Sequence, residues 1–130
     1  NPADFANALR VYYGDEAAQE FADLFTEHIA LAAELVRYAK EGNMEAVSQT
    51  EQRWFDNAAQ IADLLARINP NWSSEDWTAM LNEHLELLRD NSIDMLEGNY
   101  EASINGFDDI EAQAMEMADM MSEGIVMQFA

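Results

Sequence analysis

Apolar positions along this chain recur at spacings of three and four residues, which is the period of an amphipathic α-helix. Within residues 21–39, Phe, Leu and Ala follow this spacing and place one histidine on the same stripe. Long alternating runs are absent and β-branched residues are few, so strands are not favoured. The stripes predict four long helices, near residues 16–41, 43–68, 73–97 and 99–123, and a short helix near 2–12.

The chain contains an internal repeat of 56 residues. A gapless shift of this length places the Glu-His pair at 27–28 on the pair at 83–84, and the Glu-Gly-Asn triplet at 41–43 on that at 97–99. Each glycine can end a helix in the left-handed conformation, and the asparagine after it can cap the next helix. Because so short a connection makes neighbouring helices antiparallel, each repeat unit is interpreted as a helical hairpin.

The predicted fold class is all-α, an up-down four-helix bundle made of two tandem hairpins plus a short N-terminal helix. The 130 residues form a single domain, long enough to bury a core without a disulfide or a metal. Repeat units occupy residues 15–70 and 71–130. Residues 1–14 are interpreted as the remnant of an earlier unit, because NPADFANAL aligns with NAAQIADLL at 57–65. We therefore expect one more helix upstream.

The charge of the chain limits its partners. Six Lys and Arg against 26 Asp and Glu give a formal net charge of −20. Nucleic acid and anionic membrane surfaces are disfavoured, because both require clustered basic residues. The acidity instead favours a cation or a basic protein as partner. Cysteine is absent, which excludes disulfides and thiol nucleophiles, and no apolar run has bilayer length, so we expect a cytoplasmic protein.

Both histidines, His28 and His84, lie on apolar stripes, where an imidazole is costly unless its nitrogens find partners. One interpretation is a pair of neutral core histidines, each hydrogen-bonded to an Asn, an Asp or a backbone group across the bundle. The other is a metal site, since bundle cores can hold ions through inward His and carboxylate ligands. Asp108 and Glu111, spaced i to i+3, and Asn57 would complete a site for Zn, Fe, Mn or Ni.

Other chemistry has less support. No Glu-x-x-His element, EF-hand loop, Gly-rich phosphate loop or G-x-S-x-G elbow occurs in the chain. Thioethers bind Cu(I), but Met117, Met120 and Met121 match apolar repeat positions and are predicted to fill the core. The three Trp residues are predicted at the core or at hairpin junctions.

We therefore expect a non-enzymatic protein that acts through protein interaction or self-association, with a homodimer or a basic protein as partner. The alternative is a metal-binding bundle.

The phrases EHIALAAELV, RWFDNAAQIADLLARINPNW and MADMMSEGI resemble a group of small uncharacterised bacterial proteins, mostly from Firmicutes. The likeness covers essentially the whole chain and implies one further upstream helix with another histidine. Members of the group often have an acidic residue at the position of Asn91 and a His at that of Glu111, and this chain differs at both. Some members carry an automatic label of acetylglutamate kinase. Such kinases are larger α/β enzymes with Gly-rich loops, so this sequence does not support that activity.

Overall fold

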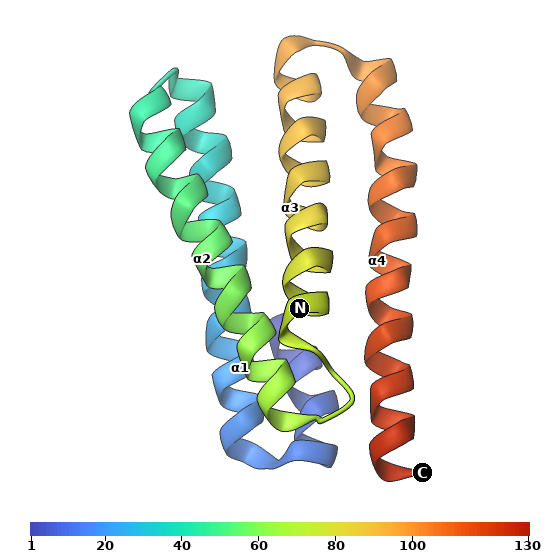
Figure 1. Ribbon diagram of the computed structural model, residues 1–130. Coiled ribbons are helices and arrows are strands. Elements are labelled where there is room, and N and C mark those ends of the chain that lie inside the picture. Colours follow the sequence, from blue (N-terminus) through green and yellow to red (C-terminus); the bar gives the residue numbers. More distant parts are fainter.

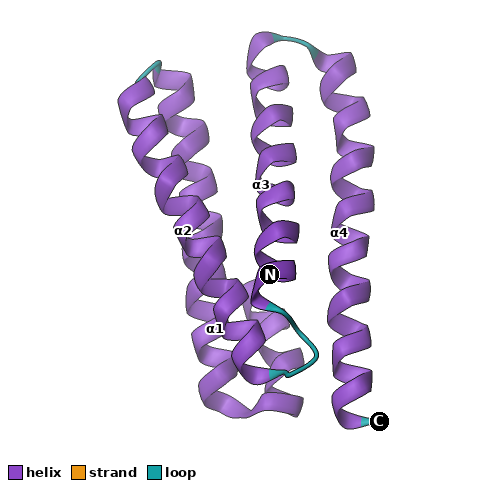
Figure 2. Ribbon diagram, viewed as in Figure 1, coloured by secondary structure: helices purple, strands orange, loops and turns teal.

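The computed structural model describes all residues from Asn1 to Ala130 and consists of four helices connected up and down (Figure 1). They are listed here in chain order: α1 (Pro2–Glu41), α2 (Met44–Ile68), α3 (Ser74–Glu97) and α4 (Tyr100–Phe129). Figure 2 shows that only short connections and the chain ends lie outside helices. The predicted all-α four-helix bundle is confirmed. None of these helices combines the length and apolarity that crossing a bilayer requires.

α1 is two helices joined at a sharp turn. Gly14 has φ 84° and ψ 177°, a backbone conformation that residues with a Cβ rarely adopt. The chain therefore folds back at this point, and residues 2–13 lie beside the long part of the helix (Figure 1). Phe5 meets Phe25 edge-on at 5.4 Å between ring centres. The predicted short N-terminal helix is thus present and packed against the bundle.

The hairpin turns follow the predicted capping chemistry with one exception. Gly42 and Gly98 both end their helices in the left-handed conformation. The side chain of Asn43 accepts from the amide of Ala46 at 3.2 Å. Asn99 occupies the equivalent cap position, but its side chain makes no capping bond and instead donates to Glu97 at 3.4 Å. The prediction of an Asn99 side-chain cap was therefore wrong.

The end of α4 also differs from the prediction. The helix continues to Phe129, whereas the pattern placed its end near residue 123, just before Gly124. In the structure this glycine is buried inside the helix and faces Trp72. The last turns are held by packing, since the Phe129 ring lies 5.5 Å from that of Tyr13. Gly124 is therefore a site of close approach between α4 and Trp72.

The core forms where the two hairpins meet. α1 packs on α2, α2 on α3 and α3 on α4, whereas α1 meets α4 through side chains at one end of the bundle, where Tyr12 and Tyr13 contact Phe129. All three Trp residues are buried, as predicted: Trp54, Trp72 and Trp77. Figure 1 shows the hairpins diverging toward the turns at Gly42 and Gly98. We call the side between α1 and the first half of α4 the open seam.

The opposite end of the bundle is closed around Tyr13. Its hydroxyl donates to Gln128 of α4 at 3.1 Å and accepts from Asn69, which follows α2, at 3.0 Å. The Tyr13 ring also lies 5.7 Å from that of Trp72. The N-terminal segment therefore fills the gap between the hairpins at this end and leaves the open seam uncovered.

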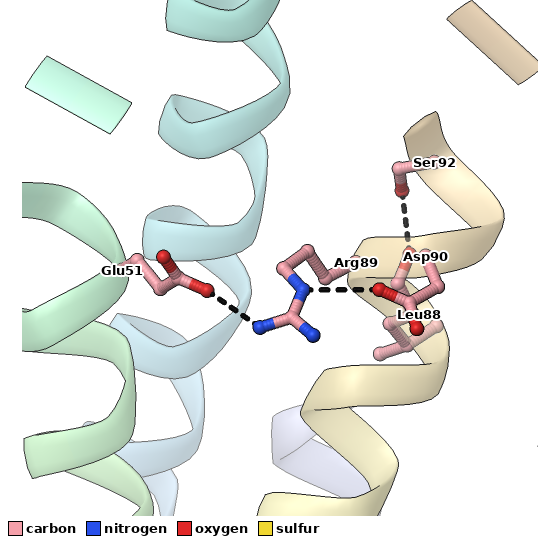
Figure 3. Close-up of polar contacts among 5 residues, drawn as sticks. All are labelled: Glu51, Leu88, Arg89, Asp90 and Ser92. Atoms are coloured by element: carbon pink, nitrogen blue, oxygen red, sulfur yellow. Dashed lines mark hydrogen bonds and ion pairs between the residues drawn. The ribbon is translucent and has the colours of Figure 1, made fainter. Parts of the chain in front are cut away.

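One ion pair, between α2 and α3, joins the two hairpins. Arg89 of α3 donates to Glu51 of α2 at 2.9 Å and to its neighbour Asp90 at 3.1 Å (Figure 3). Ser92, one turn above Leu88, donates its hydroxyl to that residue's carbonyl. Arg89 is the one basic residue in the second hairpin, and both of its contacts are carboxylates.

Candidate functional site: a cavity with two imidazoles and an exposed apolar face

His28 is buried and held by a side chain of the neighbouring helix. Its Nδ1 lies 2.7 Å from Oδ1 of Asn57, and the amide nitrogen of Asn57 donates to the Leu24 carbonyl at 3.0 Å. Trp54 donates its indole N–H to the carbonyl of His28 at 3.1 Å. The hydrogen-bonded core histidine that the sequence suggested is thus observed for His28, with Asn57 as the partner.

The second repeat builds the same contact from equivalent residues. Nδ1 of His84 lies 2.8 Å from Oε1 of Gln113, whose amide nitrogen donates to the Met80 carbonyl at 2.7 Å. Each of these three residues stands 56 positions after its counterpart in the first hairpin. Sequence reasoning did not name Gln113, although the repeat shift applied to Asn57 points to it. We call this three-residue contact the amide clamp.

The amide clamp fixes the tautomer of both imidazoles. Because each amide nitrogen donates to a carbonyl, the amide oxygen is the atom that faces Nδ1. An oxygen that can only accept requires a proton on Nδ1. In the neutral ring Nε2 then carries a free lone pair. Neither Nε2 has a partner in the protein, and neither is sealed off by surrounding atoms.

Burial keeps both rings neutral. It lowers the pKa of His28, against the opposing effect of the hydrogen bond that the ring donates to Asn57, and the nearby His84 lowers it further. Burial likewise lowers the pKa of His84, although the bond to Gln113 opposes this shift. Near neutral pH each imidazole therefore presents an acceptor nitrogen, the form that takes a hydrogen-bond donor or a metal ion.

The two imidazoles share one cavity of about 460 Å³ at the centre of the bundle. All four helices contribute to it, and twelve of its fifteen lining residues are hydrophobic. The three polar residues of the lining are His28, His84 and Ser122, so no charged side chain faces the space. Trp77 also lines the cavity, and its buried indole N–H is without a hydrogen-bond partner.

The structure does not bring the predicted metal ligands together. His28 and His84 do line one cavity, as the repeat suggested. Asp108 and Glu111 are exposed on α4, and neither lines it. Both polar atoms of the Asn57 amide already make hydrogen bonds in the clamp. No three His, Asp or Glu side chains converge anywhere in the chain. The metal hypothesis therefore keeps two nitrogen donors and lacks the carboxylates that sequence reasoning assigned.

A second feature is a group of exposed apolar residues near the tip of the α3–α4 hairpin. On α4, Tyr100, Ile104 and Phe107 follow a spacing of four and three, and all are at least 60% exposed. Continued along the helix, this stripe leads to Ala114 and Ala118 of the cavity wall. On α3, Ile93, Met95 and Leu96 are exposed too. We call the six residues the apolar tip.

The first hairpin shows that the fold does not need an apolar surface at these places. The residues 56 positions before four members of the apolar tip are polar: Arg37 for Ile93, Lys40 for Leu96, Ser48 for Ile104 and Glu51 for Phe107. Both hairpins nevertheless form, with similar turns. Exposed apolar side chains that folding does not require are typical of a binding surface.

Acidic residues surround the apolar tip. The second hairpin, residues 71–130, contains fourteen Asp and Glu but one basic residue, Arg89, which is already paired with carboxylates. The first hairpin, residues 15–70, carries four basic residues. The negative potential is therefore strongest on the half of the molecule that carries the apolar tip.

The lowered histidine pKa values predict a loss of stability in mild acid. Below pH about 6.5 the unfolded chain takes up protons on both imidazoles before the folded chain does, so the free energy of unfolding falls as pH falls. The loss continues until pH reaches the folded-state pKa values. Urea unfolding at several pH values between 7.5 and 5, in high salt to screen the carboxylates, measures it.

A variant without imidazoles isolates the histidine contribution. In His28→Leu/Asn57→Leu/His84→Leu/Gln113→Leu both clamps are replaced by apolar side chains, while every other titrating group is kept. We expect this chain to lose less stability over the same pH range than the parent. Equal losses in the two chains would contradict the assignment of buried neutral rings.

Comparison with known proteins assigns no function to the cavity or to the apolar tip. No protein-family model, no curated protein and no solved structure matches this chain. The resemblance to the small bacterial proteins stays a prediction.

Proposed function

We propose that this protein is a non-enzymatic interaction module that binds a basic, amphipathic helix of another protein along the open seam. The observation that carries the proposal is the apolar tip, whose equivalent residues in the first hairpin are mostly polar. A helix laid against Ile104 and Phe107 would cover apolar surface that α1 does not reach. Helix-in-groove binding uses such spaced apolar anchors.

The charge of the chain favours a basic partner over a second copy. Two chains of net charge −20 repel each other, most strongly where both present the acidic second hairpin. A Lys- and Arg-rich helix would instead pair with carboxylates beside the apolar tip, such as Asp108 and Glu111 on α4 and Asp94 on α3. Met95 adds an unbranched, adaptable side chain to the surface.

Enzymatic activity is not needed to explain these features. The apolar tip contains no nucleophile or metal-ligating cluster. Its aromatic residues, Tyr100 and Phe107, are of the kind that anchor protein interfaces. The rest of the surface is acidic, so two copies of the chain repel each other.

The test uses a fluorescent 18-residue helical peptide of Leu and Lys, with a Leu and Glu peptide of the same pattern as control. We expect the basic peptide to bind in a fluorescence anisotropy titration and to bind more weakly as salt rises. The double variant Ile104→Ser/Phe107→Glu copies the residues of the first hairpin. It should bind the basic peptide at least about tenfold more weakly, because it removes two apolar anchors.

This variant separates apolar contact from general charge. It adds one negative charge, so binding driven by charge alone would become tighter. Met44→Ser, at the exposed turn of the first hairpin, is the matched control and should leave affinity unchanged. Equal binding of the acidic peptide, or undiminished affinity in Ile104→Ser/Phe107→Glu, would refute the proposal. A dimer mass by light scattering in high salt, which screens the repulsion between copies, would assign the seam to a second copy if that mass is lost in the variant.

A further inference from the structure

We infer that the cavity at the centre of the bundle is a binding site for a small uncharged molecule with an aromatic or similarly bulky apolar body and a hydroxyl group. This site is separate from the apolar tip and does not depend on the proposed partner helix. The inference rests on the hydrogen-bonding groups of the cavity, on the absence of charge in its wall and on its volume.

The imidazoles supply two acceptors that the protein leaves unused. The amide clamps place a proton on Nδ1 of each ring, so Nε2 of His28 and of His84 carries a lone pair. Neither atom has a partner in the protein, and both residues line the cavity. A ligand satisfies such an atom by bringing an O–H or N–H donor, and a purely hydrocarbon ligand would leave it unpaired in an apolar space.

Trp77 supplies the complementary group. Its indole N–H is the one buried side-chain polar atom of the chain that has no hydrogen-bond partner, although the residue is only 2% exposed. An unpaired buried donor costs free energy, and surrounding atoms close this N–H off from the cavity, so a ligand oxygen reaches it and removes that cost only after the indole ring shifts. A hydroxyl group combines both roles, because its proton can go to an imidazole while its oxygen accepts from an indole.

The wall of the cavity argues against a charged ligand. No Asp, Glu, Lys or Arg lines it, so neither a cation nor an anion would find an opposite charge there. Moving an unpaired charge into an apolar space is far more costly than moving a hydroxyl. Anions are further disfavoured by the net charge of −20, and the neutral imidazoles do not offset it.

Volume and lining favour a compact, ring-sized body. The cavity of about 460 Å³ lies within the range of roughly 300 to 1,000 Å³ that small-molecule sites occupy. Phe5, Phe21 and Phe25 form one part of its wall, and Met117 and Met121 form another. Aromatic rings pack well against both kinds of side chain.

The experiment compares four ligands that share one naphthalene body. They are 2-naphthol, naphthalene, 2-naphthoate and 2-naphthylmethylammonium, titrated near pH 7.5 into the full chain by calorimetry or Trp fluorescence. We expect 2-naphthol to bind at least about tenfold more tightly than naphthalene, which is about 1.4 kcal/mol. Both charged ligands should bind more weakly than 2-naphthol.

Two variants locate the selectivity. Trp77→Phe removes the indole N–H and keeps an aromatic wall, while His84→Leu/Gln113→Leu removes one acceptor together with its clamp. In each variant the preference for 2-naphthol over naphthalene should fall at least threefold, while naphthalene itself still binds. Retained naphthalene binding shows that the cavity is intact, so a variant that fails to fold is recognised at once.

Three results would overturn the inference. The first is equal affinity of the parent chain for 2-naphthol and naphthalene, or binding of neither. The second is an unchanged preference in both variants, which would place the hydroxyl elsewhere. The third is a thermal shift with Zn²⁺, lost in His84→Leu/Gln113→Leu, together with no preference for 2-naphthol. That outcome would assign the two imidazoles to a metal.

Discussion

Gly124→Ala will destabilise the bundle by about 2 kcal/mol or more, although alanine is the better helix former. A Cβ at this position would lie 1.9 Å from Nε1 and 2.5 Å from Cδ1 of Trp72. Trp72 cannot move freely, because it is buried and its indole N–H donates to the Met120 carbonyl at 3.1 Å. Relieving the overlap must break that bond or separate α4 from the α2–α3 connection.

Gly106→Ala is the matched control on the same helix. Its Cβ would meet only the side chain of Asn91, 3.1 Å from the amide nitrogen, so a shift of a few tenths of an ångström relieves the contact, although this nitrogen also donates to the Ser103 carbonyl at 2.6 Å. The gain in helix propensity, up to about 1 kcal/mol, should then offset most of any strain. Urea unfolding followed by circular dichroism gives both values. If Gly124→Ala is as stable as the parent, α4 does not approach Trp72 this closely.

Trp72→Phe tests the cause of the clash. The smaller ring removes the indole nitrogen that a Cβ at residue 124 would strike. In this background Gly124→Ala should cost clearly less than in the parent chain, which a double-mutant cycle reports as a coupling energy. A cost that stays the same would mean that some other contact of Gly124 is responsible.

Asn57→Leu will cost about 3 kcal/mol, the second large effect that the structure predicts. The substitution leaves the Nδ1 proton of His28 without an acceptor at a site that is 8% exposed. It also removes the donor to the Leu24 carbonyl. An apolar side chain of similar size fills the space, so the cost comes from unpaired polar groups and not from a cavity.

The paired variant separates these contributions. His28→Leu/Asn57→Leu removes both partners, and replacing both ends of a buried hydrogen bond costs less than removing one. The double variant should therefore recover a substantial part of the loss. Gln113→Leu, in the second amide clamp, should cost less than Asn57→Leu because His84 is only half-buried. If Asn57→Leu unfolds at the same urea concentration as the parent, the amide clamp contributes nothing to stability.

Only part of the candidate site could be predicted from the sequence. The repeat placed both histidines at matching points of two hairpins, and they do line one cavity. Asp108 and Glu111 were grouped with them from i, i+3 spacing, yet both are exposed. Spacing along one helix tells which side chains are neighbours, and it does not tell which way that face points. The rotation of α4 against α3 decides this, and Gln113 occupies the place by His84.

The sequence by itself determined the local features of this protein: four helices, their turns at Gly42 and Gly98, and the equivalence of two hairpins. These follow from apolar period and capping, which act over a few residues. Only the tertiary structure decided which residues meet across helices. The pairs His28 with Asn57 and His84 with Gln113 are each separated by 29 positions, and Trp72 is far along the chain from Gly124. Such contacts depend on how whole helices rotate and approach, which the packing of many side chains sets together.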